Sequence, residues 1–296
     1  MKFDLILSNP PFQDVQERGK TRHKLWIDFT LKSLNEWLKP GGTLCQVSPG
    51  SFRSPSSRVL KAMKRLQTNW IDFDVRDNFP GIGSTFATYS ITNVPQAAAT
   101  ELYAEHSSIP IILSEHIPYL PLDAPEGISI HQKVMWGPGA KLRVEWDYVT
   151  AHNIKRNTTK SLSEVRTPQH AFPVFHTNNK TWWSSIKPIY LNELKVMWTR
   201  SGYFRPFFDN GTLGVTDMAY FVKVRDIEAG NNLVSNLNSK LMRYIVQSTQ
   251  WSGFTHELVF RMMPGLPTER ALTDKELYAQ FGLEKAEVLH LEKYLG

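Results

Sequence analysis

The sequence predicts an α/β domain, followed by a β-rich domain and a helical tail. Over residues 1–96, short apolar runs typical of strands alternate with an apolar pattern of helical spacing. From residue 141 onward, apolar and aromatic residues are interspersed with Asn, Thr and Pro, which is typical of short strands joined by loops. We therefore expect an α/β part at 1–96, a connecting segment at 97–140, the β-rich domain at 141–267 and the tail at 268–296.

The first predicted strand spans residues 3–7 and ends in a stiff loop. Its apolar run predicts a short buried strand, and Pro10 and Pro11 then prevent both further strand pairing and helix formation. Such a loop can hold the carboxamide oxygen of Asn9 and the backbone carbonyl of Pro10 as two convergent acceptors, with the ring of Phe12 beside them. Two acceptors and a ring are suited to binding a planar, exocyclic amino group.

This pattern also fits a reaction at that amino group. The lone pair of an aromatic amine is delocalised into its ring, so accepting both N–H bonds favours the pyramidal geometry that attacks a methyl donor. No strong base is required. The competing interpretation is a proline-containing strand end with a packed aromatic residue, but the position of Asn-Pro-Pro-Phe directly after the strand favours the functional one.

The elements that follow are predicted from apolar spacing and turn residues. Apolar residues at helical spacing predict a helix over 24–38. Pro-Gly-Gly at 40–42 ends this helix and leads into a strand at 43–48, whose carboxyl end again opens into a loop. A further strand is predicted at 87–94.

The chain resembles the gamma-type DNA adenine-N6 methyltransferases of restriction-modification systems. The resemblance rests on Asn-Pro-Pro-Phe at 9–12, on the helix, turn and strand after it, and on the segment 77–86 that precedes the next strand. Segments similar to the family's target-recognition domain follow. The resemblance spans nearly the whole chain and is strongest over 1–93 and 191–290.

This resemblance implies a site-specific, base-flipping enzyme with S-adenosylmethionine as its cofactor. The implied fold is a partial, Rossmann-like methyltransferase core followed by a target-recognition domain and a helical tail. The implied catalytic residues are Asn9, Pro10, Pro11 and Phe12. In this family, Asn rather than Ser before the two prolines favours adenine as the target base.

The resemblance also implies an aromatic residue that stacks on the flipped base. Phe79, in an aromatic-proline context, matches that position best, so that Phe12 and Phe79 would form opposite walls of the pocket. Phe86 is the competing candidate, although strand alternation makes a core position equally compatible with it. Stacking a base on an aromatic ring is worth about 1–3 kcal/mol, which is comparable with the cost of flipping.

The part of the family that binds the cofactor has no counterpart in this sequence. Full-length members carry a glycine-rich loop and an acidic residue ahead of the Asn-Pro-Pro-aromatic motif, whereas eight residues precede Asn9. The glycines at 137–139 and 211–214 lack the helix that should follow such a loop. We therefore expect a second polypeptide to carry the cofactor-binding half.

The charge of the chain predicts an anionic partner. The formal net charge is +6 and the pI is near 9.2. Basic residues gather just after the strand at 43–48 and again in polar loops, although an ordinary solvated surface would also carry such charge. The residues expected to contact the phosphates of double-stranded DNA are Arg53, Arg58, Lys61, Arg65, Lys155 and Arg156.

Two features of the carboxyl-terminal third predict helices. Apolar spacing predicts one helix over 231–247, in which Asn238 and Ser239 cap, pack or contact phosphate. Thr273 is expected to cap a further helix, with Glu276 in the capping-box position.

Other sites and locations are disfavoured. The sequence has no run of about 20 apolar residues, which a membrane span requires, and its scattered histidines form no helical ligand pair, so we expect no metal. The single cysteine, Cys45, favours a reducing compartment, and we expect the cytoplasm of a bacterial or phage-infected cell.

Two alternatives to adenine methylation are left open by the sequence. One is a non-catalytic, DNA-binding specificity subunit that keeps the pocket and has lost the cofactor. The other is methylation or modification of another amino-bearing base, which would need similar acceptors.

Overall fold

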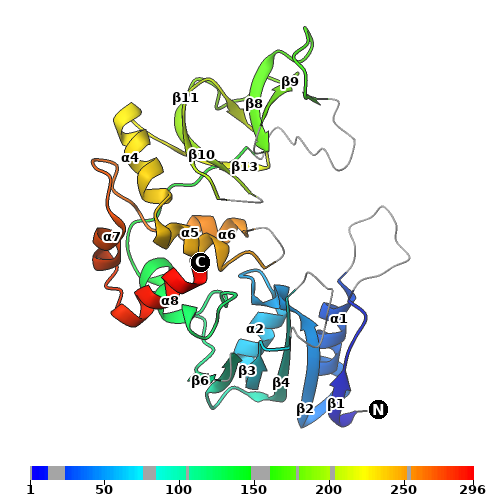
Figure 1. Ribbon diagram of the computed structural model, residues 1–296. Coiled ribbons are helices and arrows are strands. Elements are labelled where there is room, and N and C mark those ends of the chain that lie inside the picture. The colour runs from blue at the N-terminus through cyan, green and yellow to red at the C-terminus, as the bar shows by residue number, and fades with distance from the viewer. Residues whose placement is uncertain are drawn as a thin grey trace. The chain divides into compact units, whose positions relative to one another are not determined.

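The computed structural model has two compact units, Met1–Gln132 and Lys133–Gly296 (Figure 1). The predicted mixed α/β fold is confirmed, because several sheets and helices occur along the chain. The residues that the structure describes are 2–12, 24–75, 85–104, 107–147, 161–177, 180–200, 204–251 and 255–296.

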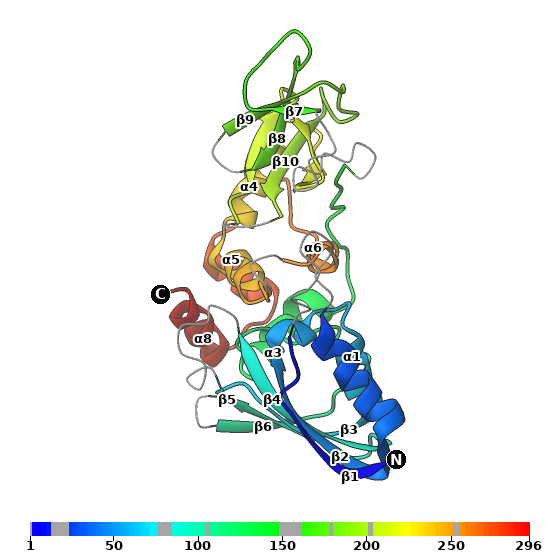
Figure 2. The ribbon, with the colours of Figure 1, turned by 90° about the vertical axis from the view of Figure 1, so that its right-hand side faces the viewer.

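The described part of the first unit contains a six-stranded sheet in the order β1-β2-β4-β3-β5-β6 (Figure 2). β1 and β2 are parallel, as are β3 and β5, and the other neighbouring pairs are antiparallel. The elements of this unit are β1 (Phe3–Ser8), α1 (Leu25–Lys32), a π-helical turn (Ser33–Trp37), β2 (Leu38–Pro49), a 3-10 turn (Gly50–Arg53), α2 (Arg58–Arg65), β3 (Leu66–Asp72), β4 (Phe86–Pro95), β5 (Thr100–Ala104), β6 (Ser107–Ile111) and α3 (Gly127–His131).

Both α1 and α2 pack on the same face of this sheet. Thr30 of α1 receives a hydrogen bond from Gln46 of β2, and the hydroxyl of Thr68 on β3 donates to the Met63 carbonyl in α2. The inward side of α2 is apolar and buried, and the helix begins at Ser57, whose side chain accepts from the Leu60 amide. This face therefore holds the core of the unit.

Two expectations for the first unit were wrong. The residues at 97–140 do not form a connecting segment, because β5 and β6 extend the sheet and the unit continues to Gln132. The strand at 3–7 is not buried: β1 is an edge strand on which Phe3, Leu5 and Leu7 are exposed. Apolar runs predict burial from composition alone, whereas burial also depends on what lies beside the strand.

The second unit contains two small sheets and a set of helices. The sheets have the strand orders β11-β10-β13 and β12-β8-β9-β7 in the described residues. The elements are β7 (Leu162–Ser163), β8 (Phe172–Thr177), β9 (Lys180–Ser184), β10 (Leu194–Thr199), β11 (Phe207–Asn210), β12 (Gly214–Val215), β13 (Ala219–Lys223), α4 (Ile227–Leu237), α5 (Lys240–Gln247), α6 (Glu257–Met262), α7 (Asp274–Gln280) and α8 (Lys285–Leu295).

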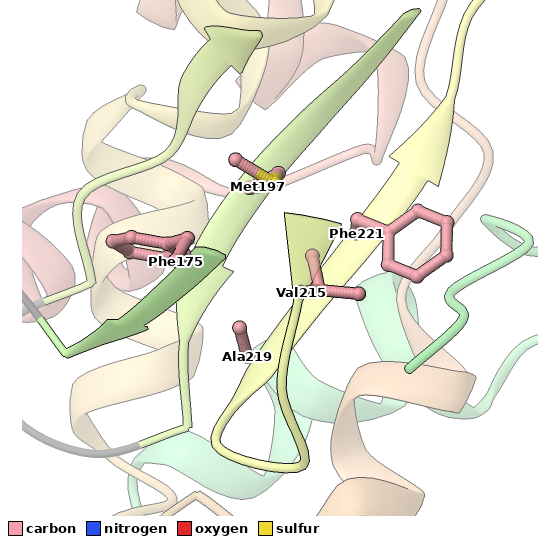
Figure 3. Close-up of a cluster of buried hydrophobic side chains, with 5 residues drawn as sticks. All are labelled: Phe175, Met197, Val215, Ala219 and Phe221. Carbon is pink, nitrogen blue, oxygen red and sulfur yellow. The ribbon is translucent and has the colours of Figure 1, made fainter. Parts of the chain in front are cut away.

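Side chains from both sheets share one core. The cluster in Figure 3 joins residues of β8, β10, β12 and β13 or their ends, and all of them are buried. This packing explains why aromatic and β-branched residues recur in a segment that is otherwise rich in Asn, Thr and Pro. The cluster consists of Phe175, Met197, Val215, Ala219 and Phe221.

The predicted helix at 231–247 is two helices, α4 and α5. The break falls where the side chain of Ser239 accepts from the Met242 amide and so caps α5, while Asn238 donates to the Pro206 carbonyl. The capping box of Thr273 and Glu276 is confirmed at α7. No described helix has both the length and the apolar character needed to cross a membrane.

Candidate functional site

The loop at 9–12 lies at the carboxyl end of β1. Because β1 runs parallel to β2, and Ser8 pairs with Gln46, this loop lies at the same sheet edge as the 3-10 turn that begins at Gly50. Ligands of open α/β sheets bind at the carboxyl ends of parallel strands. The sequence motif and the topology therefore point to the same edge.

Asn9 is accessible and Pro10 is fixed. The Asn9 residue is exposed, and its carboxamide makes no hydrogen bond within the part of the chain that the structure describes. Pro10 is buried and, like Pro11, has a ring-restricted backbone. A free amide on a rigid loop can accept or donate to a ligand without first breaking an internal hydrogen bond.

The aromatic ring of Phe12 packs against Phe86. Their ring centroids are 5.4 Å apart, with an angle of 35° between the planes. Phe86 is only 3% exposed, whereas Phe12 is half-buried. Part of the Phe12 side chain is therefore exposed and available for stacking, while Phe86 packs against the Phe12 ring and helps to hold it in place. Phe79, the residue favoured from the sequence, lies outside the described residues.

A close backbone contact fixes the start of β4 beside the end of β2. The amide of Gly50 donates to the Thr85 carbonyl at 2.7 Å. A side chain at position 50 would collide with the hydroxyl oxygen of Thr85. The close approach of these two segments therefore favours glycine at this position. Because Thr85 precedes Phe86 directly, this contact also sets the position of the supporting ring.

A buried polar network lies beside the end of β1, because its central residue, Gln46, pairs with Ser8 in the sheet. The Gln46 amide nitrogen donates to the Thr30 hydroxyl oxygen at 2.6 Å and to the Tyr89 hydroxyl oxygen at 2.9 Å. Burial raises the pKa of Tyr89 to about 12, so this phenol stays neutral in the physiological pH range. The network ties α1 to β2 and β4. Nothing in the sequence pattern singled out these three residues as partners.

Three of the basic residues predicted to contact DNA lie on one exposed side of α2. Arg58, Lys61 and Arg65 follow each other at helical spacing, and we call them the α2 basic stripe. Arg58 is paired with Asp28 of α1 at 2.9 Å, and both side chains are partly solvated. An exposed pair of this kind is weak, so it leaves the stripe able to bind phosphate.

Arg53 does not belong to that surface, which contradicts the prediction for this residue. It is 2% exposed, and its guanidinium donates to the carbonyls of Pro121 and Leu122 at 3.2 and 2.9 Å. The guanidinium carbon of Arg53 also lies 3.9 Å from the ring centre of Phe73. A buried Arg used in this way holds the 121–122 backbone in place and is not accessible to DNA. Lys155 and Arg156 lie outside the described residues.

Comparisons with known proteins identify no family. No protein-family model matches the chain, and no curated protein matches it. Similar solved structures include the type IIL restriction-modification enzyme MmeI in complex with DNA, with 10% identity and a TM-score of 0.44 over 87% of this chain. The type IIG restriction endonuclease BpuSI has 8% identity and a TM-score of 0.34 over 95% of it.

A third similar structure is the ATP-dependent type ISP restriction-modification enzyme LlaBIII bound to DNA. It has 9% identity and a TM-score of 0.39 over 96% of this chain. The chain spans less than half of each of these three proteins, namely 45%, 49% and 30% of their lengths. These likenesses are distant, with identities of 8% to 10%.

Proposed function

We propose that this chain is the target-base-binding and DNA-recognition part of a site-specific DNA adenine-N6 methyltransferase. The observation that carries the proposal is the loop after β1: the Asn9 amide is exposed, has no hydrogen-bond partner among the described residues and is followed by two prolines and by Phe12, whose ring packs against Phe86. This edge combines hydrogen-bond acceptors with an aromatic surface. A flipped adenine presents the matching features, an amino group and a flat ring.

Each residue of the loop has a separate role in this proposal. The Asn9 side-chain oxygen and the Pro10 carbonyl accept the two N–H bonds of the adenine amino group, which favours its pyramidal, nucleophilic form. Phe12 stacks on the base, and Phe86 keeps the Phe12 ring in place. Stacking worth about 1–3 kcal/mol offsets part of the cost of flipping.

S-adenosylmethionine would supply the methyl group, but neither of the two glycine-containing turns, at 137–139 and 211–214, fits a loop that binds this cofactor. The backbone amides of the glycine-containing turn at 211–214 already have a partner. Those of Gly211, Thr212 and Leu213 donate to the Asp209 carboxylate at 3.1 to 3.2 Å. The turn at 137–139 is held by Lys141, which donates to the Gly137 carbonyl at 3.0 Å. We therefore propose that the cofactor is bound outside the described residues, by a partner that carries the cofactor-binding half.

Base flipping gives a test that needs no cofactor. The fluorescence of 2-aminopurine rises when it is unstacked, and placing it opposite a mismatch lowers the cost of flipping. With such a duplex, the chain should raise the fluorescence, and Phe12→Ala should weaken retention of the flipped base by about 1–3 kcal/mol. Phe12→Tyr, which keeps the ring, is the matched control.

The same assay separates the proposal from its alternatives. A non-catalytic specificity subunit that reads an intact duplex would bind DNA without unstacking the probe. An enzyme for another amino-bearing base would unstack a probe in place of that base and leave 2-aminopurine stacked. If DNA binds at full affinity and no position tested becomes unstacked, the site does not hold a flipped base.

A further inference from the structure

One buried residue contacts the chain on both sides of the loop at 9–12. The loop follows β1, and the next described helix along the chain is α1. Gln46 of β2 pairs with Ser8, the last residue of β1. The side chain of Gln46 donates to the Thr30 hydroxyl oxygen of α1 at 2.6 Å. Gln46 therefore links the strand that precedes the loop to the helix that follows it.

The same side chain also contacts the strand that carries Phe86. Gln46 donates a second hydrogen bond to the Tyr89 hydroxyl oxygen of β4 at 2.9 Å, and the two residues are paired in the sheet. Tyr89 belongs to the same strand as Phe86, whose ring packs against Phe12. The hydroxyl oxygens of Thr30 and Tyr89 are 3.3 Å apart. These three side chains form one network, which we call the α1–sheet network.

The α1–sheet network is completely enclosed by the protein. Thr30, Gln46 and Tyr89 are all buried. The Thr30 hydroxyl donates to the Trp26 carbonyl at 2.7 Å, which leaves its oxygen oriented to accept from Gln46. Both N–H bonds of the Gln46 side chain are thus in use, whereas its oxygen has no hydrogen-bond partner among the described residues.

Stability alone does not account for polar side chains at these positions. Replacing all partners of a buried hydrogen bond by apolar groups of the same shape is often neutral or stabilising, and the buried oxygen of Gln46 adds a further cost. The adjacent pair on the same face of the sheet, Leu44 and Ile91, is apolar and buried. A hydrogen bond differs from such an apolar contact in having a preferred length and direction. The network therefore restricts where α1 can lie on the sheet.

We propose that Thr30, Gln46 and Tyr89 are positioning residues, which hold α1, β2 and β4 together so that Asn9 and Phe12 are aligned on the target base. This inference rests on the proposed function. β1 pairs only with β2 among the described strands, so the start of the loop follows β2, while the ring that supports Phe12 follows β4. A misplacement of about 1 Å can cost about 100-fold where alignment matters.

A triple variant tests the role by removing the hydrogen bonds and keeping the shapes of the side chains. Thr30→Val, Gln46→Met and Tyr89→Phe together leave apolar groups of similar size. The urea midpoint of the first unit should stay unchanged or rise, while retention of unstacked 2-aminopurine should fall by about 10-fold or more. Affinity for an intact duplex should stay near that of the wild type, because the α2 basic stripe is unchanged.

Two controls separate positioning from packing. Thr30→Ser keeps the hydroxyl and loses a buried methyl group, so it should lower stability and leave 2-aminopurine unstacking near that of the wild type. Thr68→Val removes another buried hydrogen bond between sheet and helix, the one of 2.9 Å to the Met63 carbonyl, and should also leave unstacking unchanged. If unstacking falls in proportion to stability in all three variants, the network acts through stability alone and the inference is wrong.

The placement of Phe12 can also be measured without DNA. 4-Fluorophenylalanine replaces Phe12 in the full chain, and fluorine NMR spectra are recorded with and without the triple variant. The wild-type network should give one resonance, and the triple variant should give a second or broadened one, because the ring is no longer held in a single position. A single, equally sharp resonance in both proteins would overturn the inference.

These outcomes are separable from those for the proposed function. If the fluorine spectrum changes in the triple variant but the wild-type chain unstacks no base, the proposed function is wrong and the network still positions the loop. If the wild-type chain unstacks 2-aminopurine and the triple variant matches it in both assays, the positioning role is wrong and the function stands.

Discussion

The buried imidazole of His131 should make the first unit sensitive to mild acid. His131 is completely buried, and its Nδ1 atom lies 2.8 Å from the Tyr119 hydroxyl oxygen. Burial lowers the pKa of His131 from its usual 6.5 to about 4, although attraction to Asp123 opposes this shift. The folded unit therefore holds a neutral ring that the unfolded chain protonates far more readily.

The sign and size of the effect follow from these two pKa values. Above pH 6.5 the ring is neutral in both states and stability is unaffected; as the pH falls toward 4, only the unfolded chain takes up the proton, and stability is lost. A difference of about 2.5 pKa units corresponds to a total loss of about 3 kcal/mol in the free energy of unfolding at low pH. About 2 kcal/mol of this is lost between pH 7 and pH 5.

Urea unfolding at pH 7 and pH 5 would measure this loss. Hydrogen exchange of peptides from β2 and β4 would report on the first unit separately from the second. The variant His131→Gln should lose about 2 kcal/mol less than the wild type over this pH range, whereas His116→Gln, at an exposed position of the same unit, should behave like the wild type. An equal pH dependence of the wild type and His131→Gln would refute the reasoning.

Three further predictions concern the core and the surface. Lys195 and Asp209 form a buried ion pair at 2.7 Å, and Lys195→Met should destabilise the second unit by about 3–5 kcal/mol in urea unfolding. Phe86→Ala should cost the first unit about 3–5 kcal/mol, while Phe86→Leu should cost less and still weaken 2-aminopurine unstacking, because it leaves Phe12 without its aromatic support. Reversing the charges of the α2 basic stripe should weaken binding to all duplexes alike and flatten the salt dependence of binding. A control of equal charge change reverses three exposed lysines of the second unit, namely Lys275, Lys285 and Lys293.

Local elements were predictable because their signals lie within a few residues. The proline pair ends β1 and the capping box begins α7, whereas Pro-Gly-Gly at 40–42, expected as the turn ahead of the strand, lies within β2, where Gly41 has a φ of 78°. The break between α4 and α5 was missed because the apolar spacing continues across it, while the side chain of Ser239 decides the break.

Most of the features that the sequence did not predict depend on packing between residues that are far apart in the chain. The charge of Arg53 predicts a surface position, but its partners Pro121 and Leu122 are far away in sequence. The burial of Phe86 against Phe12 likewise depends on β4 lying next to β2. The exposed state of β1 depends on its place at the end of the strand order, which apolar composition does not encode.

The most direct test of the central claim is methyl transfer by the chain joined to its cofactor-binding partner. Incorporation of tritium from labelled S-adenosylmethionine into duplex DNA, with N6-methyladenine identified in the product, should depend on Asn9. Because an acceptor of this kind acts mainly on the transition state, Asn9→Ala should lower turnover by about 100-fold or more while DNA affinity stays near that of the wild type. Normal turnover by Asn9→Ala in that complex would show that the loop after β1 is not the catalytic site.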